Sequence, residues 1–482
     1  MYIAAFDVGT TTVKGLLMDE AGQIAAVRSM ELPTIYEGDH KEQDPRTWWE
    51  AFRTISLEFT RTVSPEEIAA VGMSGQMQDL IPLDEHLDPV CSAILYSDGR
   101  AVEQAARLEA AVGAGRFLER TGNRCDGSLP LPKLMWLREE RPDLCARTAH
   151  ILISAKDYLI ARLTGVCCGD RTACSTAGAM EISRTCWDRE LLDAAGVDSR
   201  LFPKLLAPHA KVGTVLPDSG CGYLPGTAVF AGIGDAGATT LASGISRPGQ
   251  YNINLGTSGW VATVSRSVLR TESGVFNLAA AAEGHYINVV PFLNAGGVHK
   301  WVSGILGGYD NVSALLTDSV PGSHGVLFLP YLAGERFPVL DPDIRGGFVG
   351  LTPQTNSADL ARACLEGVAY SIRQGLEQFP DAPEELSLIG GGGREAAWCR
   401  ILADVLGREI AVFRDAEYLP TAAAAAVALL GLGKLRSYND LSEILHSHAN
   451  RTRYFPRSED AALYEKQYLR FCGLYPALRS LV

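Results

Sequence analysis

Asp7-Val8-Gly9-Thr10-Thr11-Thr12 and Asn254-Leu255-Gly256-Thr257-Ser258-Gly259 are two copies of one short pattern, and this pattern decides the fold. In each copy an apolar strand reaches a glycine and two hydroxyl residues, after which a second apolar strand leaves. This order predicts two hairpins, in which glycine permits a tight turn with positive φ. The turn amides and hydroxyl groups can hold phosphate oxygens. The strands are expected at Tyr2 to Phe6, Val13 to Met18, Tyr251 to Leu255 and Trp260 to Val264.

The number of copies matters more than either copy alone. A single Gly-Thr turn favours an ordinary hairpin, because such turns are common. Two copies facing each other indicate a nucleotide clamp. Only the first carries a carboxylate, Asp7, as expected if one Mg²⁺ is held on one side. Since each half of the chain has one copy, we place a boundary between two related domains near Ser243, with ligands in the cleft between them.

The composition excludes several classes of function. The chain has 482 residues, of which 47% are hydrophobic and 21% charged, a balance typical of folded soluble proteins with about two to four domains. Its formal net charge of −13 repels polyanions, which argues against nucleic acid and anionic membranes as partners. The longest apolar stretch, Ala422 to Leu430, is too short to span a bilayer and predicts a buried helix.

The cysteines and the start of the chain predict a cytoplasmic protein. Eleven cysteines form an odd number without a Cys-x-x-Cys pair, which favours reduced thiols, and no basic leader with a small-residue cleavage site is present. Strands alternate with helices throughout, which predicts an α/β protein. Helices are expected at Asp44 to Phe59, at Leu360 to Phe379 with Ser357 or Asp359 as cap, and at Ala396 to Leu406.

Two further glycine-rich segments carry possible chemistry. Gly390-Gly391-Gly392-Gly393 follows a strand and precedes a helix, so a flat ring or a ribose can lie against bare backbone. Asp235 stands alone among small residues in Ala231-Gly232-Ile233-Gly234-Asp235-Ala236. There a carboxylate can accept a proton from a substrate hydroxyl, or it can simply cap a helix. The local sequence leaves these two roles equally open.

Polar residues at the ends of two other strands suit a small ligand rich in hydroxyl groups. Gln78 and Asp79 follow one strand, and Asp98 and Arg100 follow another. These side chains offer the donors and acceptors that a sugar needs. Each alone is also compatible with a turn or a surface ion pair.

Taken together, these segments make the chain similar to the FGGY family of carbohydrate kinases, and within it to the xylulokinase branch. The similarity extends over almost the whole chain. Its motifs, in order, are Phe6 to Lys14, Glu42 to Pro45, Ser74 to Met77, Asp98 to Arg100, Pro130 to Leu137, Lys156 to Tyr158, Gly234-Asp235, Leu255 to Gly259, Leu329 to Arg336, Gly346 to Leu351, Glu366-Gly367 and Gly391 to Gly393. The resemblance implies two ribonuclease-H-like α/β domains of the actin and hexokinase type around a central cleft, 1–243 and 244–482.

The resemblance also implies roles for individual residues. Asp235 corresponds to the catalytic base, and Asp7 to the residue that organises Mg²⁺ through water. The residues implied to contact ATP are Thr10, Thr11, Gly256, Thr257, Gly296, Lys300, Gly391, Gly392, Gly393 and Ala396. Those implied to contact the sugar are Met77, Gln78, Asp98, Asp235 and Ala236. The implied reaction is in-line transfer of the γ-phosphoryl group of ATP to a ketopentose such as D-xylulose. A homodimer is compatible with the sequence.

Departures from the family pattern lie mostly at the sugar. Gln78 and Asp79 replace the His-Gly of typical xylulokinases, Ala236 replaces Asn, and Tyr96 replaces Trp. Another acceptor therefore stays open, such as ribulose, sedoheptulose, gluconate, erythritol or glycerol. An actin- or chaperone-like ATPase shares the two turns but gives no role to the Asp235 segment, and a sugar-binding regulator without catalysis does not need both Asp7 and Asp235.

Overall fold

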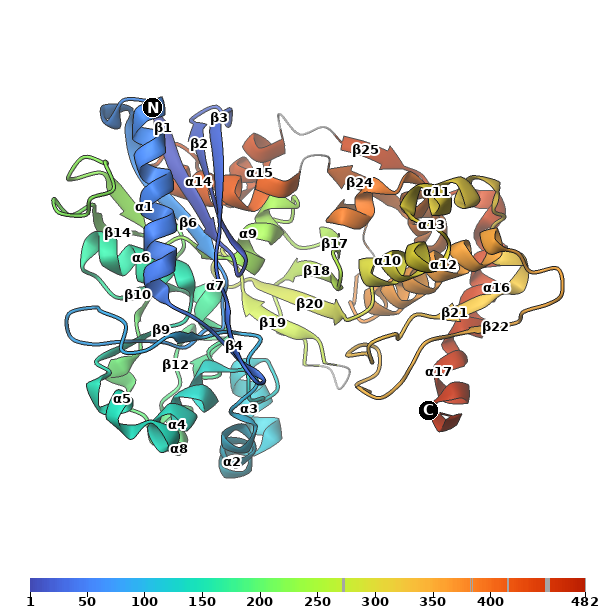
Figure 1. The fold of residues 1–482 in the computed structure, drawn as a ribbon, viewed down its shortest axis with the longest axis horizontal. Helices are drawn as coiled ribbons and strands as arrows, with labels where there is room; N and C mark the ends of the chain where they lie inside the picture. The colour runs from blue at the N-terminus through green and yellow to red at the C-terminus, as the bar shows by residue number, and fades with distance from the viewer. Residues whose placement is uncertain (271–273, 382, 384, 414–415, 447–450, 482) are drawn as a thin grey trace.

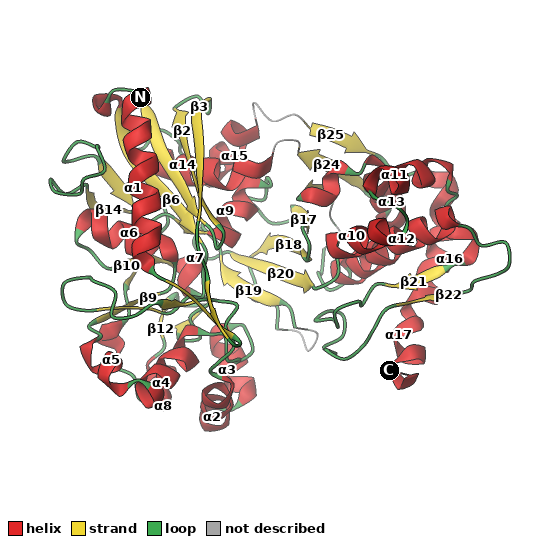
Figure 2. Ribbon diagram, viewed as in Figure 1, coloured by secondary structure: helices red, strands yellow, loops and turns green. Residues whose placement is uncertain are grey.

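Two α/β domains, each built around a seven-stranded sheet, make up the protein in this computed structural model, which describes residues 1–270, 274–381, 383, 385–413, 416–446 and 451–481 (Figures 1 and 2). Both predicted hairpins are present, and the expected α/β fold class is confirmed. The boundary near Ser243 stays a prediction.

The first sheet surrounds the first hairpin. Its central strand β1 runs antiparallel to β2 and parallel to β6, and β6 runs parallel to β15. In spatial order the sheet contains β14 (Lys211–Thr214), β15 (Ala228–Phe230), β6 (Ile68–Gly75), β1 (Tyr2–Val8), β2 (Thr12–Asp19) and β3 (Ile24–Glu31), with β16 (Ile233–Gly234) paired to the end of β6.

The second sheet repeats this order around the second hairpin. Its central strand β17 is antiparallel to β18 and parallel to β23, and β23 is parallel to β24. In spatial order it contains β19 (Phe276–Ala279), β20 (Tyr286–Phe292), β18 (Gly259–Ser265), β17 (Tyr251–Leu255), β23 (Glu385–Ile389), β24 (Glu409–Phe413) and β25 (Arg451–Tyr454). The shared order of antiparallel and then parallel strands is the ribonuclease-H-like arrangement that the family resemblance implied.

The helices cover the faces of both sheets and build a lower lobe on the first domain (Figure 2). The first sheet carries α1 (Pro45–Thr62), α6 (Ala155–Thr164), α7 (Arg171–Cys174) and α9 (Asp235–Ala242), and the lobe carries α2 (Val102–Val112), α3 (Ala114–Thr121), α4 (Pro130–Glu140), α5 (Pro142–Arg147) and α8 (Arg189–Ala195). The second domain carries α10 (Gly296–Ile305), α11 (Tyr309–Asp318), α12 (Ser357–Leu376), α13 (Ala396–Leu406), α16 (Ala461–Cys472) and α17 (Leu474–Leu478). A small three-stranded sheet contains β4 (Ile35–Glu37), β5 (His40–Gln43) and β8 (Ala93–Ile94). The two-stranded sheets are β7 (Ile81–Leu83) with β9 (His150–Leu152), β10 (Cys168–Asp170) with β13 (Lys204–Leu206), β11 (Met180–Glu181) with β12 (Cys186–Trp187), and β21 (Leu327–Leu329) with β22 (Gly347–Val349).

One predicted helix begins differently from the expectation. Helix α12 starts at Ser357, and its cap is Asn356, which accepts hydrogen bonds from the amides of Ala358 and Asp359. Asp359 bonds back to the amide of Asn356, so it completes a capping box and is not itself the cap. The expected cap was wrong because the helix begins three residues before Leu360, so that the Asn356 side chain is the one placed to accept the amides of the first turn.

The alanine-rich segment forms α14 (Leu419–Gly431), a buried helix as predicted, but it packs on the sheet of the first domain. Figure 1 shows α14, in orange, beside the blue strands β1 and β6, and α15 (Tyr438–His446) packs against α14. The approach is close: a Cβ on Gly72 would lie 2.5 Å from the carbonyl oxygen of Ala424. Small residues on both sides therefore let the second half of the chain contribute to the first domain.

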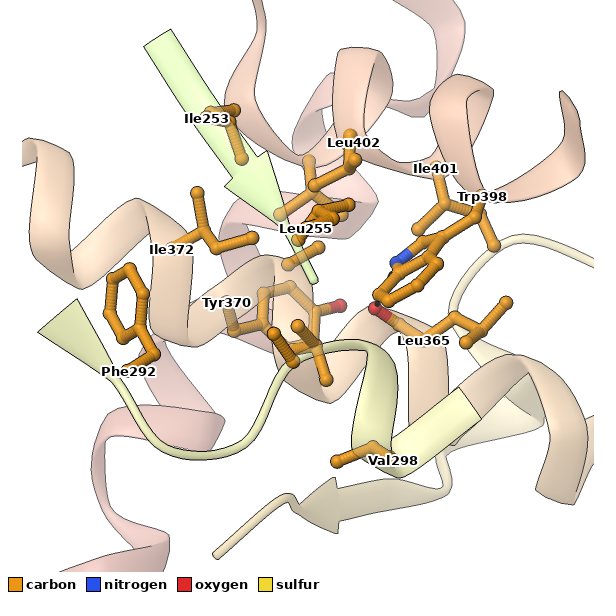
Figure 3. Packing of buried hydrophobic residues seen from close by; sticks show 14 of the residues in the cluster. Ile253, Leu255, Phe292, Val298, Leu365, Tyr370, Ile372, Trp398, Ile401 and Leu402 are labelled. Carbon is orange, nitrogen blue, oxygen red and sulfur yellow. Dashed lines mark hydrogen bonds between the residues drawn. The ribbon is translucent and has the colours of Figure 1, made fainter. Parts of the chain in front are cut away.

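The core of the second domain lies directly under its hairpin (Figure 3). Leu255 at the end of β17 packs with Trp398 of α13, and the Trp398 indole donates a hydrogen bond to the carbonyl of Leu365, 3.2 Å away. This packing fixes the turn that follows Leu255. In the described part of the chain, no helix is long and apolar enough to cross a membrane.

Candidate active site

Three neighbouring strands of the first sheet end in one row and place two carboxylates beside each other. In register, Asp7 on β1 faces Ser74 on β6, and Ser74 faces Ile233 on β16. Asp235 comes directly after β16 and is the first residue of α9. Since neighbouring strands lie about 5 Å apart, two strand spacings separate the Asp7 and Asp235 backbones by roughly 10 Å. A phosphoryl group fits in the space between them.

In the part of the chain that the structure describes, the Asp235 carboxylate accepts a single hydrogen bond. Gly234 is the residue at the cap position of α9, and it provides no side-chain capping bond. Asp235 Oδ1 accepts a bond from the Ala236 amide at 2.7 Å, within the first turn of the helix. The Asp235 carboxylate therefore does not act as the cap of the helix. Its oxygens can face a ligand at this sheet edge.

Burial and a neighbouring charge adapt Asp235 to accept a proton near neutral pH. Burial is the larger cause, and the Asp7 carboxylate adds repulsion, so that together they raise the pKa of Asp235 to about 7. The Ala236 amide opposes this by stabilising the charged form. A carboxyl group with such a pKa is a stronger base than an ordinary aspartate and is still ionised in part at neutral pH.

Asp7 suits a magnesium ion that keeps most of its waters. Its Oδ1 accepts a bond from the Ser74 hydroxyl at 2.6 Å, while Lys14 lies close enough to lower the Asp7 pKa against the larger effect of burial, which raises it. No cluster of three or more metal-binding side chains occurs among the residues the structure describes. One carboxylate beside a phosphate-binding turn is the donor set that Mg²⁺ uses when nucleotide phosphates complete its shell. These residues therefore fit the ion.

The first turn is tied to the acceptor side of the site. Thr10 Oγ1 donates to Gln76 Oε1 at 2.7 Å, and the Thr10 carbonyl accepts from Gln43 Nε2 at 2.6 Å. Thr11 is exposed. Gly9 and Gly256 were expected to have positive φ, and neither does. Each turn contains three residues and does not need a left-handed residue. The two glycines instead allow other groups to approach the backbone closely.

The second turn is locked to the start of α10. The amides of Gly296 and Gly297 donate to the carbonyls of Gly256 and Thr257, each at 2.8 Å. A Cβ on Gly296 would lie 2.4 Å from the Gly256 oxygen, so only glycine permits this contact. The two segments that the sequence predicted to contact the nucleotide therefore form one surface.

Two cavities meet at the glycine run. The first, of about 640 Å³, brings together six predicted nucleotide contacts, and the second, of about 680 Å³, shares Gly391 and Arg394 with it. The predicted residues that line the first are Gly256, Thr257, Gly296, Lys300, Gly391 and Gly392. Gly393 and Ala396 line the second cavity. Gly390, with φ of +94°, makes the sharp turn that exposes the glycine backbone to both.

The first cavity also contains residues that sequence reasoning missed. His299 and Tyr309 lie edge to face with ring centroids 5.0 Å apart, and Ser313 donates a hydrogen bond to Glu395. Burial lowers the pKa of His299, so its ring is neutral at neutral pH. These side chains offer an aromatic wall and polar groups for a heterocyclic base. Of the four, His299 directly precedes Lys300, but nothing in the pattern marked it.

The predicted acceptor residues lie on the first domain. Met77 is buried against Gly234, where a Cβ would lie 2.0 Å from the methionine sulfur. Gln78 has φ of +64°, and its Nε2 donates to Ser128 Oγ at 2.6 Å. Ala236 is half-buried beside Met77. The backbone thus brings Met77 and Ala236 to the end of β16, where Asp235 lies.

Asp98 is fully buried and its carboxylate is already occupied. It accepts bonds from the amides of Lys41 and Arg100 and from the Arg100 guanidinium, at 2.6 to 2.9 Å. These bonds outweigh burial and lower the pKa of Asp98. In this arrangement Asp98 holds the loop that carries Tyr96. Direct contact with a sugar stays a prediction.

Behind Asp235 a buried lysine holds the segment that leads to it. Lys156 Nζ lies 2.5 Å from Asp157 Oδ1 and 2.9 Å from Asp170 Oδ1, and it donates to the Ala231 carbonyl at 3.1 Å. All three charged side chains have no exposed surface. The cluster fixes the backbone at Ala231, four residues before Asp235.

The chain is similar over its whole length to carbohydrate kinases of known sequence and structure. The sequence model of the FGGY family of carbohydrate kinases matches residues 2–242 with its N-terminal domain and 251–429 with its C-terminal domain. Xylulose kinase of Escherichia coli (strain K12) is 30% identical over the full length of both chains. The solved structure of ligand-bound xylulose kinase from Lactobacillus acidophilus is 27% identical, covers 99% of this chain and 98% of that one, and has a TM-score of 0.91. Gluconate kinase from the same organism has the same identity and coverage, with a TM-score of 0.89.

Proposed function

The chain belongs to the FGGY family of carbohydrate kinases, and from that premise we propose that this ATP-dependent sugar kinase phosphorylates D-xylulose or a closely related ketopentose. The observation that carries the proposal is Asp235, a carboxylate with a raised pKa and with Ala236 as its one hydrogen-bond donor among the described residues, at the edge shared by Met77 and Ala236. Similarity to the xylulose kinase of Escherichia coli over the whole chain supports the choice of sugar.

In the proposed mechanism, Asp235 accepts the proton of the attacking sugar hydroxyl while the sugar oxygen forms a bond to the γ-phosphorus of ATP. The bond between that phosphorus and the β,γ-bridging oxygen breaks at the same time, so that ADP leaves and the sugar phosphate is formed. The turn amides at Thr10, Thr11, Gly256 and Thr257 orient the phosphates and stabilise the negative charge on them. Asp7 would hold Mg²⁺ through water, and the bound ion supplies further neutralisation of the phosphates. Bringing the two domains together excludes water, which limits hydrolysis of ATP.

The proposed nucleotide lies along the two cavities that meet at the glycine run, and the second of these also borders Thr239 of α9. The phosphates are assigned to the Gly256-Thr257 turn and to Gly296, with Lys300 at the rim. Adenosine is assigned to Gly391, Gly392 and Gly393, with Ala396 at the edge. His299 and Tyr309 are added to this set because they line the same cavity.

A carboxylate-bearing acceptor such as gluconate is the second candidate, favoured by the similarity to a gluconate kinase structure. The charges near Gln78 argue against it. Arg100 is only 3% exposed and is paired with Asp98 and Glu42, and Lys133 is fully buried. A sugar acid needs a cation free to bind it, whereas these two are already engaged.

A panel of acceptors tests the assignment. D-xylulose is expected to give the highest kcat/KM in an ADP-release assay against D-ribulose, sedoheptulose, gluconate, erythritol and glycerol, because the site offers neutral donors and acceptors for a short polyhydroxy chain. Phosphorylated product should be confirmed by mass spectrometry. No response to D-xylulose with turnover of another sugar would refute the preferred acceptor, and sugar-independent hydrolysis of ATP would favour the actin-like alternative.

The pH dependence of turnover tests the role of Asp235. Because the base must be deprotonated and its pKa is about 7, kcat/KM for the sugar is expected to rise with pH through about 7 and then level off. Asp7→Asn removes the neighbouring negative charge, so the rising limb of its residual activity should move to lower pH. A flat profile between about pH 5.5 and 8.5 in both proteins would contradict the assignment.

A further inference from the structure

Two loops that carry the proposed acceptor residues are joined to each other beneath the site. Leu80 and Ile94 exchange backbone hydrogen bonds of 2.9 and 3.0 Å. Next to this pair, Asp79 Oδ1 accepts a hydrogen bond from the Tyr96 amide at 2.9 Å. The conformation of Gln78 is thus coupled to that of Tyr96, whose ring lies 43% exposed at the surface of the site.

A buried ammonium group completes this junction. Lys133 on α4 has no exposed surface, and its Nζ donates to the carbonyls of Leu95 at 2.7 Å and Gln78 at 3.2 Å. It therefore reaches from the lobe helix to the residue before Tyr96 and to Gln78 itself. The remainder of its neighbours on α4, such as Leu131 and Leu134, are ordinary core residues.

The position of this charge is costly and is not explained by packing. Burial lowers the pKa of Lys133 to about 8, while Asp79, Asp98 and Asp126 raise it and Arg100 lowers it further. Asp79 Oδ2, also buried, has no hydrogen-bond partner in the described part of the structure. Apolar side chains in place of both Lys133 and Asp79 would avoid both costs, because buried ion pairs are often no more stable than hydrophobic replacements of the whole pair.

The backbone that Lys133 contacts is strained. Gln78 has φ of +64°, a left-handed conformation that is unfavourable for a residue with a side chain unless its surroundings hold it. The bond to its carbonyl is one such constraint. In this conformation the Gln78 amide reaches Ser128, so the direction of the amide depends on the strained backbone.

We infer that Lys133 is a positioning residue for the acceptor sugar: by binding the carbonyls of Gln78 and Leu95, it holds Gln78 and Tyr96 in the geometry that aligns the attacking hydroxyl. The inference rests on the proposed function, because Gln78 is assigned to the acceptor there. Lys133 itself does not touch the sugar. Its loss should therefore affect acceptor use and leave the nucleotide cavities of the second domain intact.

Lys133→Met tests this, with kcat and KM determined separately for the best acceptor and for ATP. The expected result is a loss of roughly 10- to 100-fold in kcat/KM for the acceptor, since small misplacements of reacting groups have effects of this size. KM for ATP should stay within about twofold of the wild-type value. Lys133→Met/Asp79→Asn, in which the neutral amide replaces the unpaired carboxylate, should recover thermal stability but not acceptor use.

Arg138→Met is the matched control. Arg138 lies on the same helix and also donates to two carbonyls, those of Ala195 at 3.0 Å and Gly196 at 2.6 Å, on the side away from the acceptor loops. It should lower stability without changing acceptor kinetics. If Lys133→Met does not fold, Lys133→Met/Asp79→Asn, which also lacks the Nζ donor, replaces it in the same comparison.

Two results would separate the possible failures. If no sugar in the acceptor panel is phosphorylated by the wild-type protein, the proposed function fails. If a sugar is phosphorylated but the Lys133 variants keep its kcat/KM, or lose acceptor and ATP parameters equally together with stability, Lys133 is a structural residue and the inference is wrong.

Discussion

Asp235→Asn is expected to lower kcat by roughly 10²- to 10⁴-fold, the usual contribution of a positioned general base. The amide is nearly the same size as the carboxylate but cannot accept the proton of the sugar hydroxyl. ATP should still bind, since Asp235 lines neither of the two nucleotide cavities. Turnover is measured by ADP release at saturating sugar and ATP, and nucleotide affinity by calorimetry.

Thermal unfolding of the same variant shows whether the loss is chemical. The folded-state pKa of Asp235, about 7, lies above the ordinary value of 3.8, so the ionised group destabilises the folded protein as pH rises through this range. Asparagine removes that penalty, and the variant should unfold at a slightly higher temperature than the wild type at neutral pH. Functional residues often carry such a stability cost.

Asp188→Asn provides the matched substitution. Asp188 caps α8 through a bond from the Leu191 amide at 3.1 Å and lies in the lower lobe, and asparagine caps helices equally well. Its turnover should equal that of the wild type. If Asp235→Asn keeps kcat within about threefold of this control, Asp235 is not the base.

The sequence predicted the two sheets and their turns because their determinants are local. Alternating apolar strands and small turn residues mark β1, β2, β17 and β18 without reference to the remainder of the fold. The partner of α14 was not predictable, because an alanine-rich helix carries no direction in its pattern and packs against Gly72, about 350 residues away. Sequence order alone assigned that helix to the second domain.

The site divides in the same way. Asp235 stood out because it is isolated among small residues, and the glycine run because it leaves the backbone bare. Lys133 and Lys156 lie in motifs that identified the family, yet nothing in the sequence indicates that they are buried. A lysine is exposed in most proteins, and only tertiary structure shows which carbonyls and carboxylates surround it. The left-handed conformation of Gln78 is likewise a consequence of these contacts.

Lys156→Met is expected to have the largest effect on stability, because it leaves two buried carboxylates, Asp157 and Asp170, without their counter-charge. Breaking a buried ion pair by removing one partner costs about 3–5 kcal/mol. Burial and the Asp170 charge already raise the pKa of Asp157 to about 6 despite the attraction of Lys156. Without the lysine the pKa of Asp157 should rise further, so the loss of stability should be greater at pH 8 than at pH 6.

Urea and thermal unfolding at the two pH values measure this loss, with Lys434→Met as the control. Lys434 forms an ion pair with Glu20 at 3.3 Å, but both side chains are about half exposed, so its removal should cost at most about 1 kcal/mol. Adding Asp157→Asn to Lys156→Met removes one uncompensated charge and should restore part of the stability. It should not restore turnover, because the bond from Lys156 to the Ala231 carbonyl, which fixes the segment before Asp235, is still missing. Equal losses for the two lysine variants would show that the buried cluster does not stabilise the first domain.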